Sequence, residues 1–193
     1  VPRSLPPSGG IGLKSVHYQN VLDDTAQAKR PSWVEVHPQN YFGDGGPAHR
    51  WLTAIAGVYP LSFHSVGLSL GSAGGLNAAD LDQLAALCER YRPAMVSDHL
   101  SWSGNSFRDD EMTEPEFIHA LCRTAGCGLL FDINNVEVTA TNIGLDMDAY
   151  IDAIDPAIVG EIHLAGHARE EHAGGPLLID DHGSIVSDIT WNL

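Results

Sequence analysis

Short apolar runs alternate along this chain with segments of helical spacing, and this alternation restricts the fold more than any other feature of the sequence. The runs occupy residues 10–13 (GIGL), 33–36 (WVEV), 61–66 (LSFHSV), 94–100 (AMVSDHL), 128–133 (GLLFDI) and 158–164 (IVGEIHL). Strands that alternate with helices form a parallel sheet, because each helix carries the chain back to the start of the next strand.

The segments between the runs carry clear helix signals. One helix has Asn77 as its N-cap, leucines at helical spacing, and Pro93 just past its end. Another begins at Thr113, where Glu116 three residues later completes a capping box. The predicted helices cover 78–92, 113–126 and 146–154.

Six strands without a nucleotide-binding fingerprint favour an α/β barrel over a doubly wound sheet. The predicted fold is a TIM (β/α)8 barrel, with residues 1–193 forming a single domain. The number of strands is two short of eight. The shortfall falls near 103–114, where a long polar stretch precedes a helix, and after 193, where the chain stops behind SDITWNL.

The composition excludes several classes of protein. Ten basic against 25 acidic side chains give a net charge of −15 at pH 7, which is the wrong sign for binding nucleic acid or an anionic membrane surface. No apolar run approaches the roughly 20 residues that cross a bilayer, and the first residues lack a secretory signal core, so a cytoplasmic location is predicted. Three cysteines without a CxxC pair predict buried thiols.

Ionisable and amide side chains collect where the predicted strands end, which is where an α/β barrel carries its functional residues. Those residues are Glu35, His37, His64, Asp98, His99, Asp132, Asn134, Asn135, Glu161 and His163, and a later loop adds Asp180 and His182. Side chains two apart on a strand point the same way. We therefore expect three aligned pairs: Asp132 with Asn134, Glu161 with His163, and Asp180 with His182 if that segment is extended.

This set of side chains predicts a metal site. Imidazoles and carboxylates without thiolates suit iron, manganese or zinc. Any single histidine of this kind is more often structural, but so many ionisable groups at consecutive strand ends would be destabilising without a compensating ion. Four histidines and two aspartates exceed the ligands of one catalytic ion, so two or three ions are predicted. The predicted ligands are His64, His99, Asp132, His163, Asp180 and His182.

Other polar residues are expected to support these ligands by hydrogen bonds or to contact the substrate. They are Glu35, Asn40, Asp98, Asn134, Glu161 and His167. Three further histidines lie in helical or loop stretches and are expected to be solvated: His49, His119 and His172. A glycosidase built on paired carboxylates would leave the histidines unexplained.

The stretches that carry these residues resemble the DUF692 (UPF0276) family of multinuclear non-haem iron-dependent oxidative enzymes, typified by the methanobactin biosynthesis enzyme. The matching motifs include WVEVHPQNYF, VSDHLSW, LLFDINNVEVTATN, GEIHLAGH and LLIDDHG. The resemblance implies a xylose-isomerase-like barrel with two or three irons bound at the six positions named above, where manganese or zinc could substitute. It also implies that ferrous iron and O₂ oxidise a residue, often cysteine, of a ribosomally made precursor peptide, which a small partner protein commonly delivers.

The sequence departs from the family pattern at the same two places where strands are missing. It lacks a Glu-Asn-Pro strand between SDHLSW and GLLFDINN, and it stops before a last strand that carries a further carboxylate ligand. Either segments are absent from the sequence there, or this is a truncated relative with an impaired site. The leading hypothesis is an iron-dependent oxidoreductase that modifies a peptide. The alternatives are a divalent-metal sugar isomerase or hydrolase on the same barrel, and a non-catalytic metal- or peptide-binding module.

Overall fold

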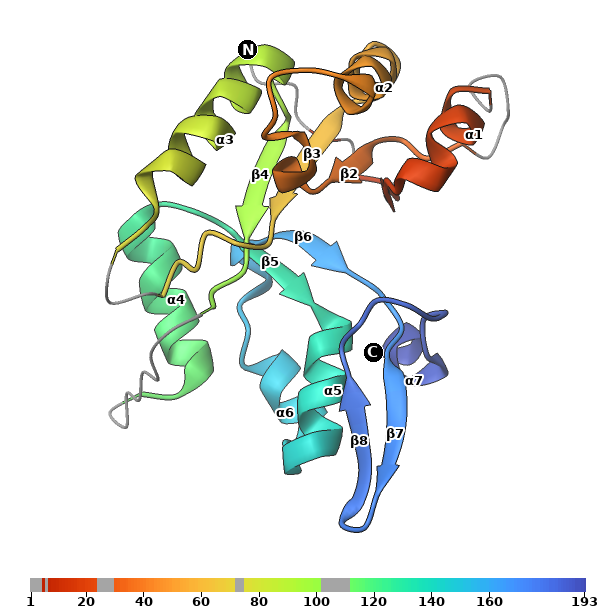
Figure 1. The fold of residues 1–193 in the computed structure, drawn as a ribbon. Helices are drawn as coiled ribbons and strands as arrows, with labels where there is room; N and C mark the ends of the chain where they lie inside the picture. Colours follow the sequence, from red (N-terminus) through yellow and green to blue (C-terminus); the bar gives the residue numbers. More distant parts are fainter. Residues whose placement is uncertain (1–4, 6, 24–29, 72–74, 102–111) are drawn as a thin grey trace. The chain divides into compact units, whose positions relative to one another are not determined.

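The computed structural model describes residues 5, 7–23, 30–71, 75–101 and 112–193. The chain divides into two compact units, Val1–Phe107 and Arg108–Leu193, and each is described by itself (Figure 1). The glycine-rich stretch at 70–75 and the polar stretch at 103–114 fall partly outside the described residues.

The first unit is built on a parallel sheet in the order β1-β2-β3-β4. Its strands are β1 (Ile11–Gly12), β2 (Val34–Val36), β3 (Leu61–Ser65) and β4 (Met95–Asp98). Its helices are η1 (Ser15–His17), α1 (Tyr18–Asp23), η3 (Pro38–Tyr41), α2 (Pro47–Ala56) and α3 (Ala78–Tyr91). Because the order in the sheet follows the order in the chain, helical connections carry the chain from each strand to its neighbour.

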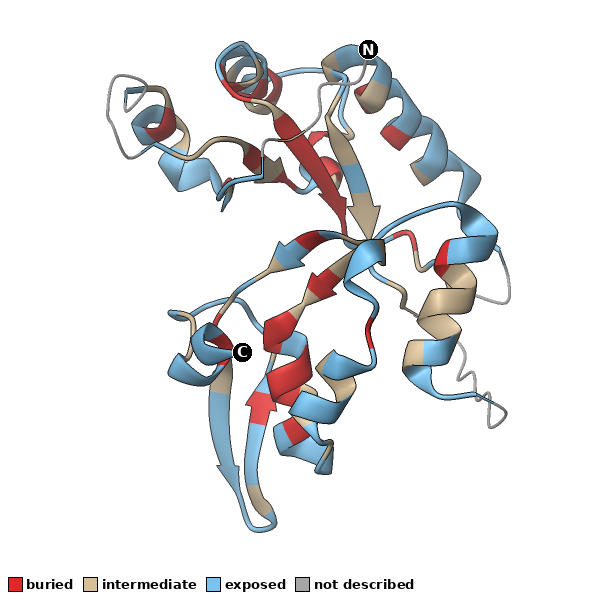
Figure 2. Ribbon diagram, turned by 180° about the vertical axis from the view of Figure 1, so that it is seen from behind, coloured by how far each residue is buried: buried red, intermediate tan, exposed pale blue. Residues whose placement is uncertain are grey.

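Strand β3 is buried along its whole length, as expected for an inner strand covered on both faces (Figure 2). Phe63 at its centre is fully buried and belongs to one apolar cluster with Leu52 and Ile55 of α2 and with Val34 and Val36 of β2. Each such side chain contributes about 1.5–3 kcal/mol by leaving water. The strand that carries His64 is therefore firmly held.

The second unit contains a parallel pair and a hairpin. The strands β5 (Leu129–Asp132) and β6 (Val159–His163) pair in parallel, whereas β7 (Ala168–His172) and β8 (Gly175–Ile179) pair antiparallel. The helices are α4 (Glu114–Ala125), α5 (Ile133–Ile143), α6 (Met147–Asp152), η4 (Pro156–Ile158) and α7 (Asp188–Asn192). Strand β8 lies along α5 (Figure 1). The core gathers Phe131, Ile133, Val136 and Ile154.

The predicted helix starts are confirmed. Asn77 caps α3 through its side chain, and Asp146 caps α6 in the same way. Thr113 and Glu116 form the complete capping box at α4, where the Thr113 N–H donates to Glu116 Oε2 at 2.7 Å. That backbone hydrogen bond lowers the pKa of the Glu116 carboxyl, because it stabilises the ionised form.

The predicted alternation of helices with parallel strands is confirmed, and each of the six predicted runs contains a strand. The architecture is consistent with part of a TIM-like fold. In the described part of the chain, however, the strands form three separate sheets and no closed barrel. The hairpin of β7 and β8 was not predicted, because the AREEH sequence of β7 is charged and exposed. Barrel closure and the single-domain organisation stay predictions.

Two expectations drawn from composition can be compared with the structure. The three cysteines are free thiols, but only Cys122 is buried; Cys88 is half-buried and Cys127 is exposed, so the expectation of buried thiols is wrong for Cys127. Burial raises the pKa of the Cys88 and Cys122 thiols. Within the described ranges, none of the helices combines the length and the apolar character needed to span a bilayer.

Tyr150 of α6 should make the stability of the protein sensitive to alkaline pH. The pKa of Tyr150 is raised to about 12. Burial is the largest cause, followed by the negative charge of Glu114 and by the hydrogen bond to Glu114. The folded state favours the neutral phenol, so its stabilisation is complete below the unfolded pKa of about 10 and is lost as the pH rises from 10 through 12. We expect the Tm to fall more steeply over that interval in the wild type than in Tyr150→Phe. Equal slopes in thermal scans of the two proteins would contradict this role.

Candidate metal centre

Three of the predicted ligands of the second unit meet at one point. Asp132, Asp180 and His182 each offer a ligand atom, and these atoms all lie within 4.8 Å of one another. Nε2 of His182 lies 3.0 Å from Asp180 Oδ1 and 3.4 Å from Asp132 Oδ2. Asp132 ends β5, whereas Asp180 and His182 lie in the turn after β8. We call these three residues the carboxylate-histidine group.

His163 approaches the same group from β6. The parallel pairing of β5 with β6 makes Asp132 and His163 direct neighbours in the register. Their side chains face each other, with 3.9 Å between His163 Nδ1 and Asp132 Oδ2, and each is only 12% exposed. Strand pairing alone therefore brings a fourth predicted ligand to this point.

The two carboxylate oxygens of Asp132 have different surroundings. Oδ1 accepts the N–H of Asn135 at 3.0 Å and so caps the first turn of α5. Oδ2 is buried and has no hydrogen-bond partner among the described residues, although His182 and His163 face it. A buried carboxylate oxygen without a donor is costly unless a cation compensates it.

The spacing of the carboxylate-histidine group suits a divalent ion. Two atoms that bind one ion at about 2.1 Å, with angles of about 90–109°, lie about 3.0–3.4 Å apart. The two distances from His182 Nε2, 3.0 and 3.4 Å, fall at these limits. The residues therefore fit a metal ion in number, type and spacing.

Amide side chains at the start of α5 hold Asp180 in place. Asn134 donates to Asp180 Oδ1, and Asn135 Nδ2 donates to Oδ2 at 3.2 Å. Asn134 is fully buried, and its own oxygen accepts the Nδ1–H of His167 at 2.9 Å. Both oxygens of Asp180 are thus oriented, and the predicted supporting roles of Asn134 and His167 stay predictions.

Two of the predicted aligned pairs arise differently from expectation. Strand β5 ends at Asp132 and α5 starts at Ile133, so Asn134 lies in a helical first turn and not on a strand. The segment after β8 is a turn in which His182 adopts a left-handed conformation with φ of 49°. Strand alternation was therefore the wrong reason for pairing Asp132 with Asn134, which reaches Asp180 from the first turn of α5. The extended segment on which the pairing of Asp180 with His182 depended is not formed, and a turn brings these two side chains together.

Glu137 is a buried carboxylate that sequence reasoning missed. Its Oε2 accepts hydrogen bonds from Ser187 Oγ at 2.5 Å and from Thr190 Oγ1 at 2.6 Å, and its Oε1 lies 4.0 Å from His167 Nε2. The signal was an acidic residue flanked in the sequence by two valines, Val136 and Val138, in a helix whose buried residues are mostly apolar. Glu137 fastens α7, and with it the segment that follows His182, to α5.

In the first unit the structure brings together His64 and His99. Their Nε2 atoms lie 3.0 Å apart, a separation that also suits two ligands of one ion at a right angle. His64 ends up almost completely buried, and its Nδ1 bonds to Ser97 Oγ at 2.9 Å because His64 and Ser97 are neighbours in the register of β3 and β4. Ser97, which was not among the predicted site residues, thereby orients the His64 ring.

The remaining predicted residues are placed as follows. Asp98, the last residue of β4, accepts the Leu68 N–H at 3.3 Å. Glu35 is half-buried on β2, with a carboxylate oxygen within 4.8 Å of a ring nitrogen of His64. Asn40 lies in η3, and Glu161 is buried on β6. The supporting roles of these residues stay predictions.

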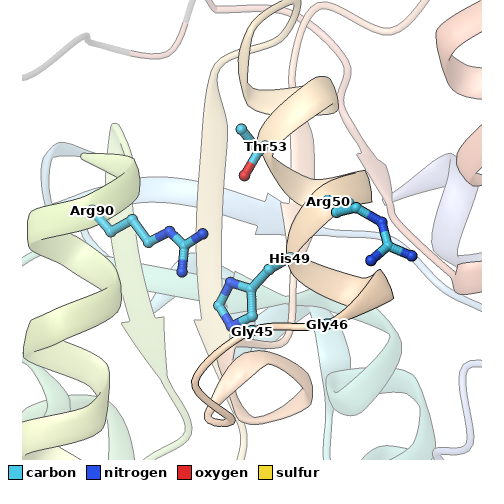
Figure 3. A pocket seen from close by; sticks show the side chains of 6 residues that line it. All are labelled: Gly45, Gly46, His49, Arg50, Thr53 and Arg90. Carbon is cyan, nitrogen blue, oxygen red and sulfur yellow. The ribbon is translucent and has the colours of Figure 1, made fainter.

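The expectation of solvated histidines is wrong for His49. Its side chain is buried, with Nε2–H donating to the Gly43 carbonyl at 2.6 Å and Nδ1 bonded to Tyr91 OH at 2.8 Å. These bonds hold the loop before α2 against α3. A cavity of about 360 Å³ lies beside His49, and the Arg90 side chain of α3 points into it (Figure 3). None of the predicted ligands lines this cavity. His119 is half-buried and accepts the Asp155 N–H at 3.0 Å, and His172 is exposed as expected.

Comparison with known proteins identifies the family. A family described as "RiPP precursor modification enzyme MbnB/TglH/ChrH" matches residues 8–109 and 105–193. The chain is 34% identical over 229 residues to a UPF0276 protein of Psychromonas ingrahamii, covering 95% of this chain and 80% of that protein. It is 36% identical over 234 residues to a UPF0276 protein of Caulobacter vibrioides, covering 98% and 82%.

These matches confirm the resemblance that the motifs suggested. The family modifies precursor peptides of RiPPs, the ribosomally made and post-translationally modified peptides. The candidate ligands of the second unit lie inside the second matched segment, and His64 and His99 lie inside the first. The chain therefore belongs to the MbnB/TglH/ChrH family of RiPP precursor modification enzymes.

Proposed function

We propose that this protein is a multinuclear non-haem iron-dependent oxidase that uses O₂ to modify a residue, most readily a cysteine, of a ribosomally made precursor peptide. The observation that carries the proposal is the carboxylate-histidine group, with ligand atoms within 4.8 Å, in a chain of a peptide-modifying family. His64 and His99 supply a second set of candidate ligands on the first unit.

The type of ligand supports iron. Imidazole and carboxylate ligands without thiolates suit a non-haem iron site, and manganese or zinc would be accommodated by the same atoms. Bound iron would supply the one-electron and O₂ chemistry that no side chain of the protein provides. The side chains of the protein would hold and orient the ligands. Asn134 and Asn135 orient Asp180 by hydrogen bonds, and the N-cap hydrogen bond to α5 orients Asp132.

The exposure of the group supports a large substrate. Asp132 and His163 are each 12% exposed, whereas His182 is 41% exposed, so the group is closed on the β5 side and open at His182. A peptide side chain can approach from that side while the sheet excludes water from the other. The proposed partners are accordingly a precursor peptide, O₂ and a small protein that delivers the peptide.

The lengths of the alignments support the proposal that a further strand belongs within this sequence. The alignments with the two relatives run over 229 and 234 positions although the chain has 193 residues, and the two matched segments of the family overlap at 105–109. That is the region where the sequence lacks the expected Glu-Asn-Pro strand. The carboxylate ligand on that strand would complete the proposed cluster.

Metal analysis and O₂ uptake test the proposal together. The protein, purified without air, is expected to carry more than one iron per chain, and to consume O₂ only when its precursor peptide is present. A peptide with Cys→Ser at the modified position should stop the uptake. Activity with zinc or manganese in the absence of O₂ would instead favour a hydrolase or isomerase, and metal binding without turnover of any peptide encoded beside the gene would favour a binding module.

A further inference from the structure

Asn142, near the carboxyl end of α5, makes a pair of hydrogen bonds to β8 and contacts no candidate ligand. Its Nδ2 donates to the Leu178 carbonyl at 2.8 Å, and its Oδ1 accepts the Leu178 N–H at 2.8 Å. One side chain thus satisfies both backbone groups of a residue on the edge of a sheet, as a neighbouring strand would. Leu178 is only 5% exposed, so these bonds replace hydration that the backbone has lost.

The sequence of β8 limits the backbone positions at which Asn142 can make both hydrogen bonds. In an antiparallel hairpin the N–H and C=O of a residue point together to one side, and the side alternates along the strand. The groups of Leu178 face α5, so those of Pro176, two residues earlier, face the same way. Proline has no N–H, so a two-residue shift of β8 that brought Pro176 opposite Asn142 would break one of the two bonds. A shift by one residue would present neither group to Asn142.

The same face of α5 that carries Asn142 also reaches Asp180. Asn135, Thr139 and Asn142 follow the i, i+4, i+7 spacing of one helix face. Asn135 Nδ2 donates to Asp180 Oδ2 at 3.2 Å, and Thr139 Oγ1 donates to Asn135 Oδ1 at 3.5 Å. Side chains of α5 therefore hydrogen-bond to β8 at Leu178 and to Asp180, just past the end of that strand.

We infer that Asn142 is a positioning residue for the metal centre: it sets the register of β8 against α5 and thereby places Asp180 and His182 opposite Asp132. The inference rests on the proposed role of those three residues in binding metal. It assigns a function to a side chain that touches none of them. A slip of β8 by one residue would turn Asp180 to the other face of the strand.

Cobalt binding to the full chain tests this positioning role. Co²⁺ reports its coordination in the visible spectrum and requires no turnover. Asn142→Leu keeps the size of the side chain but removes its donor and acceptor, and we expect Co²⁺ affinity at the carboxylate-histidine group to fall about 10–100-fold, as for other partners of metal ligands. The matched control is Thr141→Leu, a polar-to-leucine change at the exposed adjacent position, which should leave the affinity unchanged.

A double-mutant cycle separates positioning from a general loss of stability. If Asn142 acts by placing Asp180 and His182, then Asn142→Leu should cause a smaller loss of Co²⁺ affinity in an Asp180→Ala background than in the wild type. An equal loss in both backgrounds would overturn the inference, as would unchanged affinity in the single variant.

Hydrogen exchange of the metal-free protein tests, without any metal, whether Asn142 holds β8 in place. Exchange over residues 175–182 should rise in Asn142→Leu but not in Thr141→Leu, because the Leu178 N–H loses its acceptor. Unchanged exchange would overturn the inference even if metal binds. A wild-type protein that binds no iron or cobalt would defeat the proposed function instead, and the exchange result would still report on Asn142.

Discussion

Asp132→Asn should lose the metal ion of the carboxylate-histidine group while the protein keeps its fold. Asparagine and aspartate are equally good N-caps, so the Oδ1 bond to the Asn135 N–H is retained. The variant lacks the charge of Oδ2, the atom that faces His182 at 3.4 Å. We expect metal affinity to fall at least about 100-fold, more than for loss of a supporting partner, and O₂-dependent turnover to fall with it. Metal content and the Tm of the metal-free protein are the measurements.

Two further variants make this result specific to Asp132. Asp132→Ala removes the cap as well as the ligand, so it should bind no metal and also lose about 1 kcal/mol of stability. Asp146→Asn makes the same chemical change at the N-cap of α6, away from the candidate ligands, and should change neither metal content nor stability. Full iron content in Asp132→Asn would remove Asp132 from the ligand set.

Glu137→Leu should lower the stability of the protein more than loss of the Asp132 cap does. The carboxylate is only 3% exposed and accepts hydrogen bonds from Ser187 and Thr190. Hydrogen bonds to a charged group contribute about 1.5–3 kcal/mol each, and the Thr190 hydroxyl would stay buried without its acceptor. We expect the free energy of unfolding in urea to fall by about 2–4 kcal/mol.

Removing the donors together with the acceptor is the control for Glu137. In the triple variant Glu137→Leu, Ser187→Ala and Thr190→Val, no hydroxyl is left without an acceptor, and replacement of both partners by apolar groups is nearly neutral. Much of the lost stability should therefore return. A single variant as stable as the wild type, or a triple variant no better than the single one, would show that Glu137 does not fasten α7 to α5.

The features of the fold that depend on local spacing could be predicted from the sequence. The apolar runs marked the strands, and the side chains of Asn77 and Thr113 marked helix starts, because both signals lie within a few residues. The hairpin of β7 and β8 could not be predicted in this way. Its first strand carries Arg169, Glu170 and Glu171, and its stability depends on contacts with α5, about 30 residues earlier in the chain.

In the candidate site, too, local sequence signals could not predict contacts between residues that are far apart in the chain. The inventory of strand ends found Asp132, because functional residues of such folds follow the strands, and a later loop added Asp180 and His182. It gave the wrong reason for their approach, because nothing local in the sequence said that β5 would end at Asp132 and continue directly as a helix. It also missed Glu137 and Asn142, whose roles follow from partners about 36 to 53 positions away. Burial of His49 was missed for the same reason.

The origin of the carboxylate-histidine group in two distant segments has a consequence for how the protein is handled in the cell. Asp132 and Asp180 lie roughly 50 residues apart, so an ion bound by both would cross-link the chain and reduce the entropy of the opened state. Without the ion, β8 is held to α5 by the packing of the buried Leu178 and by hydrogen bonds from side-chain amides. If the proposed ion binds there, its loss would loosen the contact between β8 and α5, and cleavage by proteases at the exposed tip, Ala173 and Gly174, would then depend on the supply of the metal.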